Sequence, residues 1–449
     1  RKVQAVASGA LASGDTVIVN ADGTVSVVAL VNSSQSVGSS TAFEVSTVTN
    51  IASTFDSNSN KVVIAYTDGG NSSHGTAVVG TISGSSISFG TPVVFNSNST
   101  SYIGCTFDSS SNKVVIAYRA SNTAGYSNVG TVSGTGISFG SQVTFNSTGG
   151  FYWLGITFDS SSNKVVVAWK DGENTSNGRA AVGTVSGTSI SWGSLVQFQT
   201  SDTNHISCTF DSNANKVVIA YQNNNNSNYG TAIVGTVSGT SISFGTATVF
   251  ESSATEKTSC SYDASAQKIV IAYVDGGNSN KGTVVVGTVS GTNISFGTPV
   301  YIGGGSGVAI NIVSGISYDA NGEKTIIAYQ DDSDNGYGKV VSGTVNGTSI
   351  SFETPLVFAN NSSGIGSVSA AYDSFNQKVA VSYVNSNNND GYGAVFSPAG
   401  QAPNLTSENF IGIASNGYAT GQAATINVKG FIDDNQSSLT AGQSYYVQT

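Results

Sequence analysis

Charged side chains and cysteine are scarce in this sequence of 449 residues, and methionine is absent. Charged residues make up 9% of the chain, and its 16 basic residues leave a net charge of −10. Proteins that bind nucleic acid need a basic surface to neutralise phosphates, so this composition excludes nucleic acid as a partner. No apolar run approaches the roughly 20 residues of a transmembrane helix, and we therefore expect no membrane span.

Cysteine is limited to Cys105, Cys208 and Cys260, which are dispersed along the chain. An odd number of distant cysteines is not a disulfide framework, and these have no zinc-ligand spacing. We interpret them as small buried hydrophobic residues. Apolar residues at helical spacing are also missing, so we predict essentially no helix.

The sequence does contain one unit that recurs seven times. Each copy begins with an aromatic residue and Asp, and it carries Lys five residues after the Asp, at Lys61, Lys113, Lys164, Lys216, Lys268, Lys324 and Lys378. The Asp residues recur every 51 to 56 positions, a period that indicates a solenoid, an array or a propeller. The aromatic–Asp pairs are Phe55-Asp56, Phe107-Asp108, Phe158-Asp159, Phe210-Asp211, Tyr262-Asp263, Tyr318-Asp319 and Tyr372-Asp373.

Each copy predicts four strands that are rich in Val, Ile, Thr, Phe and Tyr. The second strand is apolar on both faces, as in a covered strand. The fourth alternates and is followed in the first copy by Pro92, which is typical of an edge strand. Such units predict an all-β fold, a seven-bladed β-propeller over 39–398. In the first copy the strands are 51–55, 61–66, 76–82 and 86–95.

The seventh copy lacks its fourth strand, because the repeat stops after Phe396. A fourth-strand segment precedes the first full copy instead. We predict that residues 41–45 complete the seventh blade beside the strand at 392–396, which removes an open sheet edge.

The flanks, 1–30 and 400–449, do not follow the repeat. Asp22-Gly23 marks a hairpin in the first, and both flanks place a Gly turn before a Val/Ile strand. We predict that they form one small β-barrel or sandwich domain. The segment YYVQT at the end of the sequence has no strand after it, so a neighbouring subunit is expected to supply its partner in a homo-oligomer.

One position differs in every copy while its surroundings stay nearly constant. It lies five residues before each aromatic, at the start of an innermost strand, so its seven side chains should ring one mouth of a central channel. We interpret the ring, with Phe151 and Tyr152 nearby, as a candidate glycan-binding or protein-binding site. Drift at an unconstrained position and subunit contact are the alternatives. The ring consists of Asn50, Tyr102, Trp153, His205, Lys257, Val313 and Ser367.

The repeated Asp and Lys predict a turn stabilised by backbone hydrogen bonds and a pair across the hairpin. Catalysis has little support. A sialidase-like site needs an arginine cluster, and the chain has only Arg1, Arg119 and Arg179. No feature singles out Glu251, Glu256 or Asp202 as paired carboxylates, so we expect no enzyme.

No cofactor other than a metal is indicated, and the metal candidates are loops that contain Asp. Asp68, Asp171 and Asp275 occupy loops similar to that of the sixth copy. Asp331, Asp332 and Asp334 crowd the sixth copy, and oxygen-rich loops suit Ca²⁺, although this loop lacks EF-hand spacing. We treat these residues as a weak calcium candidate.

Repeats such as FDSNSNKVVIAY, at 55–66, resemble those of structural proteins of aquatic bacteriophages, of the tail-fibre or virion-surface type. The flank NFIGIASNGYATGQ, from residue 409, resembles the small β domain that often ends them and a pattern of capsid-decoration proteins. The resemblance implies a structural subunit of a fibre or filament, extracellular or on a virion surface, and it brings no catalytic residues. We therefore expect a non-enzymatic subunit that displays the propeller, whose variable face binds glycans. A secreted, monomeric lectin-like adhesin is the alternative, and a glycan-active enzyme the third.

Overall fold

The computed structural model describes residues 2–28, 30–121, 123–147, 150–173, 176–303, 307–403 and 410–428. The chain divides into one unit of Gln35–Pro398 and a second of Arg1–Ser34 with Ala399–Thr449. The described residues form strands, three short 3₁₀ helices and no α-helix, so the all-β prediction is confirmed. No helix in this part of the chain is long and apolar enough to cross a membrane.

The first repeat folds into four antiparallel strands, as predicted, but the fourth ends at Phe89 and residues 93–95 of the predicted strand begin the next one. The four strands are β7 (Val48–Asp56), β8 (Lys61–Asp68), β9 (His74–Ser83) and β10 (Ser86–Phe89), paired in that order. The side chains of β8 are almost entirely buried, as expected for a strand covered on both faces. In β10 only Ile87 is buried, which fits an outer strand.

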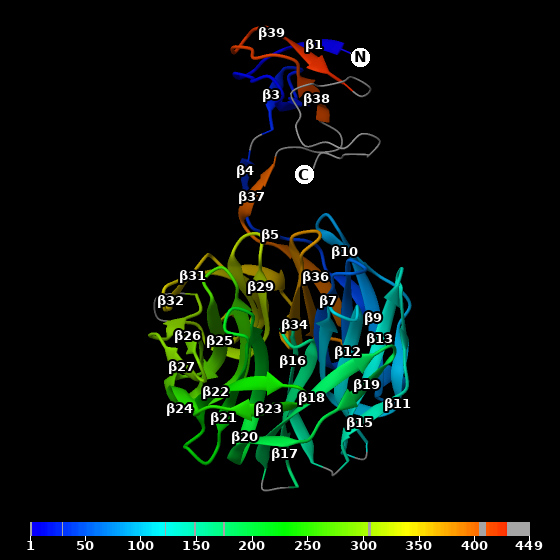
Figure 1. Cartoon of the computed structure of the whole chain (residues 1–449), viewed down its shortest axis with the longest axis vertical. Coiled ribbons are helices and arrows are strands. Elements are labelled where there is room, and N and C mark those ends of the chain that lie inside the picture. The colour runs from blue at the N-terminus through cyan, green and yellow to red at the C-terminus, as the bar shows by residue number, and fades with distance from the viewer. Residues whose placement is uncertain are drawn as a thin grey trace. The chain divides into compact units, whose positions relative to one another are not determined.

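The later repeats follow the same order, from an innermost strand to an outer edge (Figure 1). The innermost strands are β11 (Val93–Asp108), β16 (Phe151–Asp159), β20 (Val196–Asp211), β24 (Thr248–Asp263), β29 (Ile310–Asp319) and β34 (Ile365–Asp373). The second strands are β12 (Lys113–Ala120), β17 (Lys164–Asp171), β21 (Lys216–Asn223), β25 (Lys268–Asp275), β30 (Lys324–Asp331) and β35 (Lys378–Asn385). The third strands are β13 (Gly125–Ser133), β18 (Asn177–Ser186), β22 (Tyr229–Ser238), β26 (Lys281–Ser290), β31 (Tyr337–Asn346) and β36 (Gly391–Ser397).

Short strands complete the outer edges, and 3₁₀ turns follow three of the second strands. The outer strands are β14 (Gly136–Phe139), β15 (Val143–Asn146), β19 (Ser189–Trp192), β23 (Ser241–Phe244), β27 (Asn293–Phe296), β28 (Val300–Tyr301), β32 (Ser349–Phe352) and β33 (Leu356–Ala359). The 3₁₀ helices are η1 (Gly69–Asn71), η2 (Gly276–Asn278) and η3 (Asp332–Asp334).

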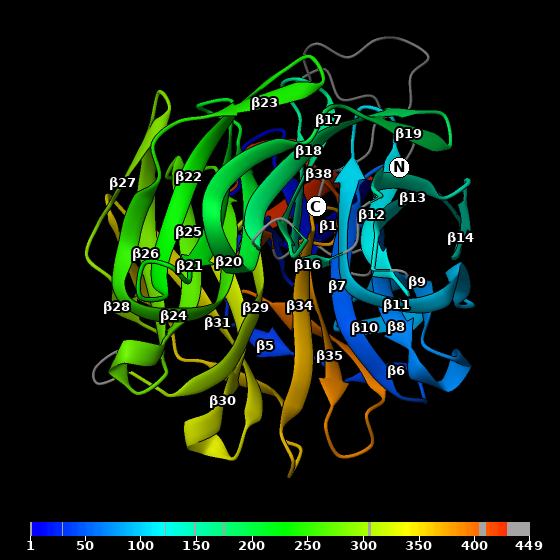
Figure 2. The same ribbon diagram turned by 90° about the horizontal axis from the view of Figure 1, so that it is seen from below.

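The propeller closes on itself by the predicted route. Two strands from before the first repeat, β5 (Ser36–Val37) and β6 (Thr41–Glu44), pair with β36 of the seventh repeat. At the centre, β34 lies beside β7 (Figure 2), where the Ser53 and Ser369 hydroxyls are 2.8 Å apart. The last repeat is therefore joined to the first without a covalent bond.

A backbone contact between neighbouring repeats is the same at the closure as elsewhere. A Cβ on Gly140, which follows an outer strand, would lie 1.8 Å from the Thr188 carbonyl oxygen of the next repeat. At Gly38, in the segment that closes the ring, the corresponding distance to the Ser85 oxygen is 1.7 Å. Only glycine fits an approach this close.

The core lies between neighbouring repeats, where covered second strands pack against each other. Val63 and Ala65 of β8, for example, pack in one cluster with Ile116 and Tyr118 of β12. A contact between two aromatic rings recurs here. In the first instance the centre of the Phe95 ring lies 5.0 Å from that of the Tyr118 ring. Equivalent ring contacts join Phe43 to Tyr66, Phe198 to Tyr221, Phe250 to Tyr273 and Phe358 to Tyr383.

The repeated Asp stabilises its turn through the backbone, and the predicted pair with Lys is wrong. Asp56 is buried and accepts hydrogen bonds from the backbone N–H groups of Asn58 (2.9 Å) and Ser59 (3.0 Å). Among the described residues, no repeated Asp forms an ion pair with the Lys of its own turn. The backbone N–H groups of the turn therefore satisfy the carboxylate without the Lys.

The two flanks form one small β domain, which contains its own core. Its antiparallel sheet has the order β1 (Lys2–Val6), β39 (Ala423–Asn427), β38 (Phe410–Ala414), β2 (Thr16–Val19) and β3 (Val25–Val27). A bridge between Ala7 and Val25 brings the two end strands together, which closes the sheet as a barrel does. Val17, Val25 and Ile426 are fully buried inside it. A separate pair, β4 (Leu30–Ser33) with β37 (Gly400–Pro403), also joins the flanks.

Candidate functional site

The variable position of the repeat lies in a β-bulge. On β7 the pairing with β8 shifts register between Thr49 and Ala52, so the intervening residues are unpaired. The same shift occurs in every later innermost strand. A bulge re-aims side chains, and here it turns the variable residue away from the regular alternation of the strand.

Five of the bulge residues have a left-handed backbone, although none of them is glycine. Their φ angles are 51° at Asn50, 49° at Tyr102, 48° at Trp153, 49° at His205 and 51° at Lys257. This conformation costs an ordinary side chain about 1–2 kcal/mol. Strained residues of this kind cluster at functional sites, where the surrounding fold holds them in place.

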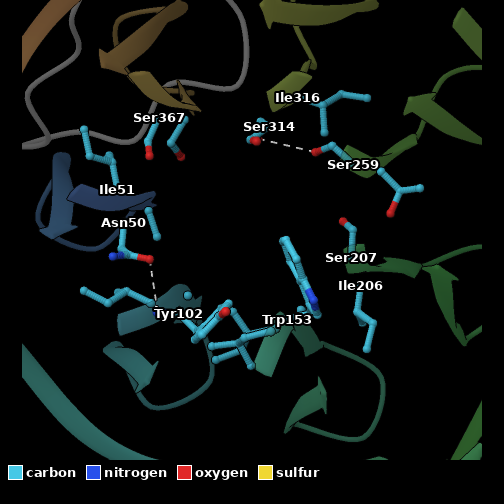
Figure 3. A pocket seen from close by; sticks show the side chains of 18 of the residues that line it. Asn50, Ile51, Tyr102, Trp153, Ile206, Ser207, Ser259, Ser314, Ile316 and Ser367 are labelled. Atoms are coloured by element: carbon cyan, nitrogen blue, oxygen red, sulfur yellow. Dashed lines mark hydrogen bonds between the residues drawn. The ribbon is translucent and has the colours of Figure 1, made fainter. Parts of the chain in front are cut away.

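Six of the seven predicted ring residues line one cavity of about 460 Å³. Figure 3 shows it encircled by side chains from successive innermost strands. Val313 lies on β29, and its side chain is outside the described part of the structure. A cavity of this size is typical of small-molecule sites. The six lining residues are Asn50, Tyr102, Trp153, His205, Lys257 and Ser367.

One side of the cavity is aromatic. The Trp153 ring lies 5.8 Å from the Tyr102 ring and 4.2 Å from the His205 ring, and it projects into the cavity (Figure 3). Asn50 borders this side, and its Oδ1 accepts a hydrogen bond from the backbone N–H of Tyr102 (3.2 Å). Tyr102, Trp153 and His205, from three adjacent repeats, thus form a continuous wall of aromatic rings.

The other side of the cavity carries hydroxyl groups. Ser259, Ser314 and Ser367 lie across from Trp153 (Figure 3). The Ser259 hydroxyl donates weakly to the Ser314 carbonyl (3.4 Å), and the Ser207 hydroxyl accepts from the Cys260 backbone N–H (3.1 Å). Aromatic faces opposite hydroxyl groups can contact the apolar and polar faces of one ligand.

The electrostatics of the cavity depend on His205 and Lys257. Burial lowers the pKa of His205 to about 3, with smaller contributions from the charges of Lys257 and Lys170. Lys170 forms an ion pair with Asp202 (Nζ–Oδ1 2.7 Å), which lies outside the cavity lining. The described lining contains no Asp or Glu, so Lys257 gives the cavity a positive character.

Phe151 and Tyr152, predicted as additional ligand contacts, do not line the cavity. Phe151 is fully buried against Phe145 and Trp169, so it cannot reach a ligand there and that prediction is wrong. Tyr152 lies under Arg119, whose Cζ is 4.5 Å from its ring centre. Their place beside Trp153 in the sequence suggested a shared role. The β-bulge between Tyr152 and Gly155 instead turns Trp153 away from the face that simple alternation would have made it share with Phe151.

The three cysteines line the cavity beneath the ring and have no disulfide partner. Burial raises the pKa of Cys105 to about 12, and that of Cys260 also to about 12. The pKa of Cys208 is likewise raised by burial. Cys208 and Cys260 are buried, as predicted for small hydrophobic residues, whereas Cys105 is half-buried. Thiols with raised pKa values stay protonated and unreactive at neutral pH.

The acidic loop proposed for calcium is held by a lysine. Lys339 Nζ lies 2.9 Å from Asp331 Oδ2 and 2.6 Å from Asp334 Oδ2, and Asp331 also caps η3. Burial raises the pKa of Asp332. In the described ranges, no three His, Cys, Asp or Glu side chains gather as metal ligands do. The loop chemistry therefore fits an ion pair better than Ca²⁺.

The acids considered for glycoside hydrolysis do not converge. Glu251 accepts a hydrogen bond from the Tyr273 hydroxyl (2.8 Å), Asp202 pairs with Lys170, and Glu256 is exposed on β24 outside the cavity lining. Two acids at one opening, as such a mechanism needs, are not found among the described residues that line the cavity.

Comparison with known proteins shows the fold. No protein-family model and no curated protein matches the sequence. The chain is similar to the BP39L lectin of Burkholderia pseudomallei, with a TM-score of 0.60 and 11% identity over 81% of this chain and 99% of the lectin. It is also similar to the β-propeller domain of Cps50 (Swd1) from Myceliophteria thermophila, with a TM-score of 0.51 and 7% identity over 81% of this chain and 99% of that domain. Together with the closed ring of repeats, these likenesses show a β-propeller.

Proposed function

We propose that the propeller is a non-enzymatic, glycan-binding module, with the cavity at the bulge ring as its binding site. A single observation carries the proposal: the Trp153 ring projects into a cavity whose opposite side presents serine hydroxyls. Sugars offer apolar C–H faces, which stack on aromatic rings, and hydroxyl edges, which exchange hydrogen bonds with polar side chains. The likeness to a lectin fold supports the choice of ligand class.

The backbone of the ring argues against drift at an unconstrained position. At a position with a left-handed backbone and no function, Gly or Asn would cost the least conformational free energy. The bulges carry Tyr102, Trp153, His205 and Lys257 instead, each with φ near 50°. Bulky side chains at four strained positions, all lining one cavity, favour a selected contact with a ligand.

A glycan array followed by calorimetric titration of the full chain tests this function. Trp153→Ala should weaken binding at least tenfold, because the main stacking surface is lost. Phe375→Ala is the matched control, since this exposed aromatic residue lies in the turn at the other end of an innermost strand. Binding that Trp153→Ala leaves unchanged would remove the cavity as the sugar site.

We further propose that the small β domain assembles the chain into an extracellular or virion-surface fibre. The resemblance of the repeats and flank to phage structural proteins suggests this role. Val3, Val6 and Val19, large apolar residues of β1 and β2, are 37%, 48% and 38% exposed. Exposed valines on so small a domain are suited to subunit contact. The end of the chain, including YYVQT, lies outside the described residues.

Electron microscopy of the purified full chain tests assembly. Filaments or rings are expected, and Val19→Asp should disperse them without unfolding the propeller. Isolated particles from the unaltered chain would support the monomeric adhesin instead. Thr16 is the control position, because Thr16→Asp on the same strand changes charge equally but removes no exposed apolar side chain.

A further inference from the structure

Lys257 brings an unneutralised positive charge to the cavity. Its ammonium group has no ion-pair partner among the described residues, and no carboxylate lines the cavity with it. The whole chain has a net charge of −10, so the cavity is opposite in sign to the molecule around it. A cation left unpaired in a cavity is available to a negatively charged ligand.

His205 offers a hydrogen-bonding group beside this charge. Its Nδ1 is buried and has no partner in the described part of the chain. Buried polar atoms are normally satisfied, so an orphan atom on a cavity wall indicates a missing ligand or water. Because burial holds its pKa near 3, His205 is neutral at physiological pH and adds no second charge.

These groups surround the same aromatic surface. Lys257 Nζ lies 6.0 Å from the centre of the Trp153 ring, and the His205 ring lies 4.2 Å from it on the neighbouring repeat. A sugar stacked on Trp153 would therefore place a substituent within reach of the ammonium group. Lys170, by contrast, is already paired with Asp202.

We propose that the cavity selects anionic saccharides, with Trp153 as the stacking surface and Lys257 as the partner of a carboxylate or sulfate. This inference rests on the proposed glycan-binding function and adds the charge of the sugar. A nucleic acid strand is a poorer fit, because it needs an extended basic groove. Here a single unpaired lysine lines a cavity of about 460 Å³.

The test compares matched saccharides against the full chain by calorimetric titration. The probes are glucose with glucuronic acid, and galactose with galactose-6-sulfate, each as a terminal residue of the same linker. The acidic member of at least one pair should bind about tenfold more tightly, a difference of about 1.4 kcal/mol, because its charged group forms a charge-assisted hydrogen bond with Lys257. Lys257→Gln should abolish that preference and the sensitivity to salt.

Lys268→Gln is the matched control, because it removes the same charge from the turn of the same repeat. Preference lost in Lys257→Gln and kept in Lys268→Gln supports the inference, and the pair that shows it distinguishes carboxylate from sulfate. Equal binding of neutral and acidic sugars, weakened by Trp153→Ala, would overturn the charge preference and leave the glycan function intact. Binding of no saccharide, or displacement by a single-stranded oligonucleotide, would overturn both.

Discussion

Phe43 provides a quantitative test of how the propeller closes. This residue lies on β6, before the first repeat, yet it is only 6% exposed and its ring is 5.1 Å from that of Tyr66 and 5.6 Å from that of Phe89. Replacing a buried Phe by Ala removes its hydrophobic transfer energy and leaves a cavity, which together cost about 3–5 kcal/mol. Phe43→Ala should lower the free energy of unfolding by that amount.

Phe95→Ala is the matched control, because Phe95 occupies the equivalent place between two interior repeats. It is 7% exposed and its ring lies 5.0 Å from that of Tyr118 and 5.7 Å from that of Phe139. Urea denaturation should give the two variants losses within ~1 kcal/mol of each other. A loss below ~1 kcal/mol for Phe43→Ala, beside a full loss for Phe95→Ala, would refute closure by the N-terminal segment.

Three further predictions concern the same closure and the cavity. Gly38→Ala should destabilise the fold by about 1–3 kcal/mol and match Gly140→Ala, because both would force a Cβ into a neighbouring carbonyl; a neutral Gly38→Ala would contradict closure. The folded protein leaves His205 neutral, with its pKa lowered from 6.5 to about 3, whereas the unfolded chain protonates it. Stability should therefore fall as pH decreases from about 6.5 toward 3, and His205→Gln should reduce that fall in pH-dependent urea midpoints; an unchanged slope would refute burial of the ring. Cys260 is buried and its pKa is raised to about 12, so it should react with a thiol reagent at pH 8 only after unfolding; fast labelling of Cys260 in the native protein would contradict its burial.

Much of the fold could be predicted from the sequence because the repeat is regular. The Val/Ile pattern after each repeated Lys identified the covered second strands, and the missing fourth strand of the last repeat indicated closure by 41–45. The structure also explains one departure from the repeat. Glu353 replaces the glycine that follows other outer strands, because the seventh repeat has no outer hairpin to press against it.

Part of the site could be predicted by comparing the seven repeats, because one position carries a different residue in each while its neighbours stay nearly constant. The bulge that aims them could not be predicted, because the left-handed residues include Tyr102 and Trp153 and carry no glycine signal. The burial of Phe151 was missed for a related reason. Strand alternation places it against Trp169, and the register of that alternation is set by the bulge itself.

A crystal structure of the full chain with the tightest-binding saccharide of the array tests the role of the cavity most directly. We predict a sugar ring stacked on Trp153, with its acidic group within hydrogen-bond distance of Lys257 Nζ. A sugar bound elsewhere on the propeller, for example beside Tyr392 and Val357 at the cavity between the sixth and seventh repeats, would contradict this assignment.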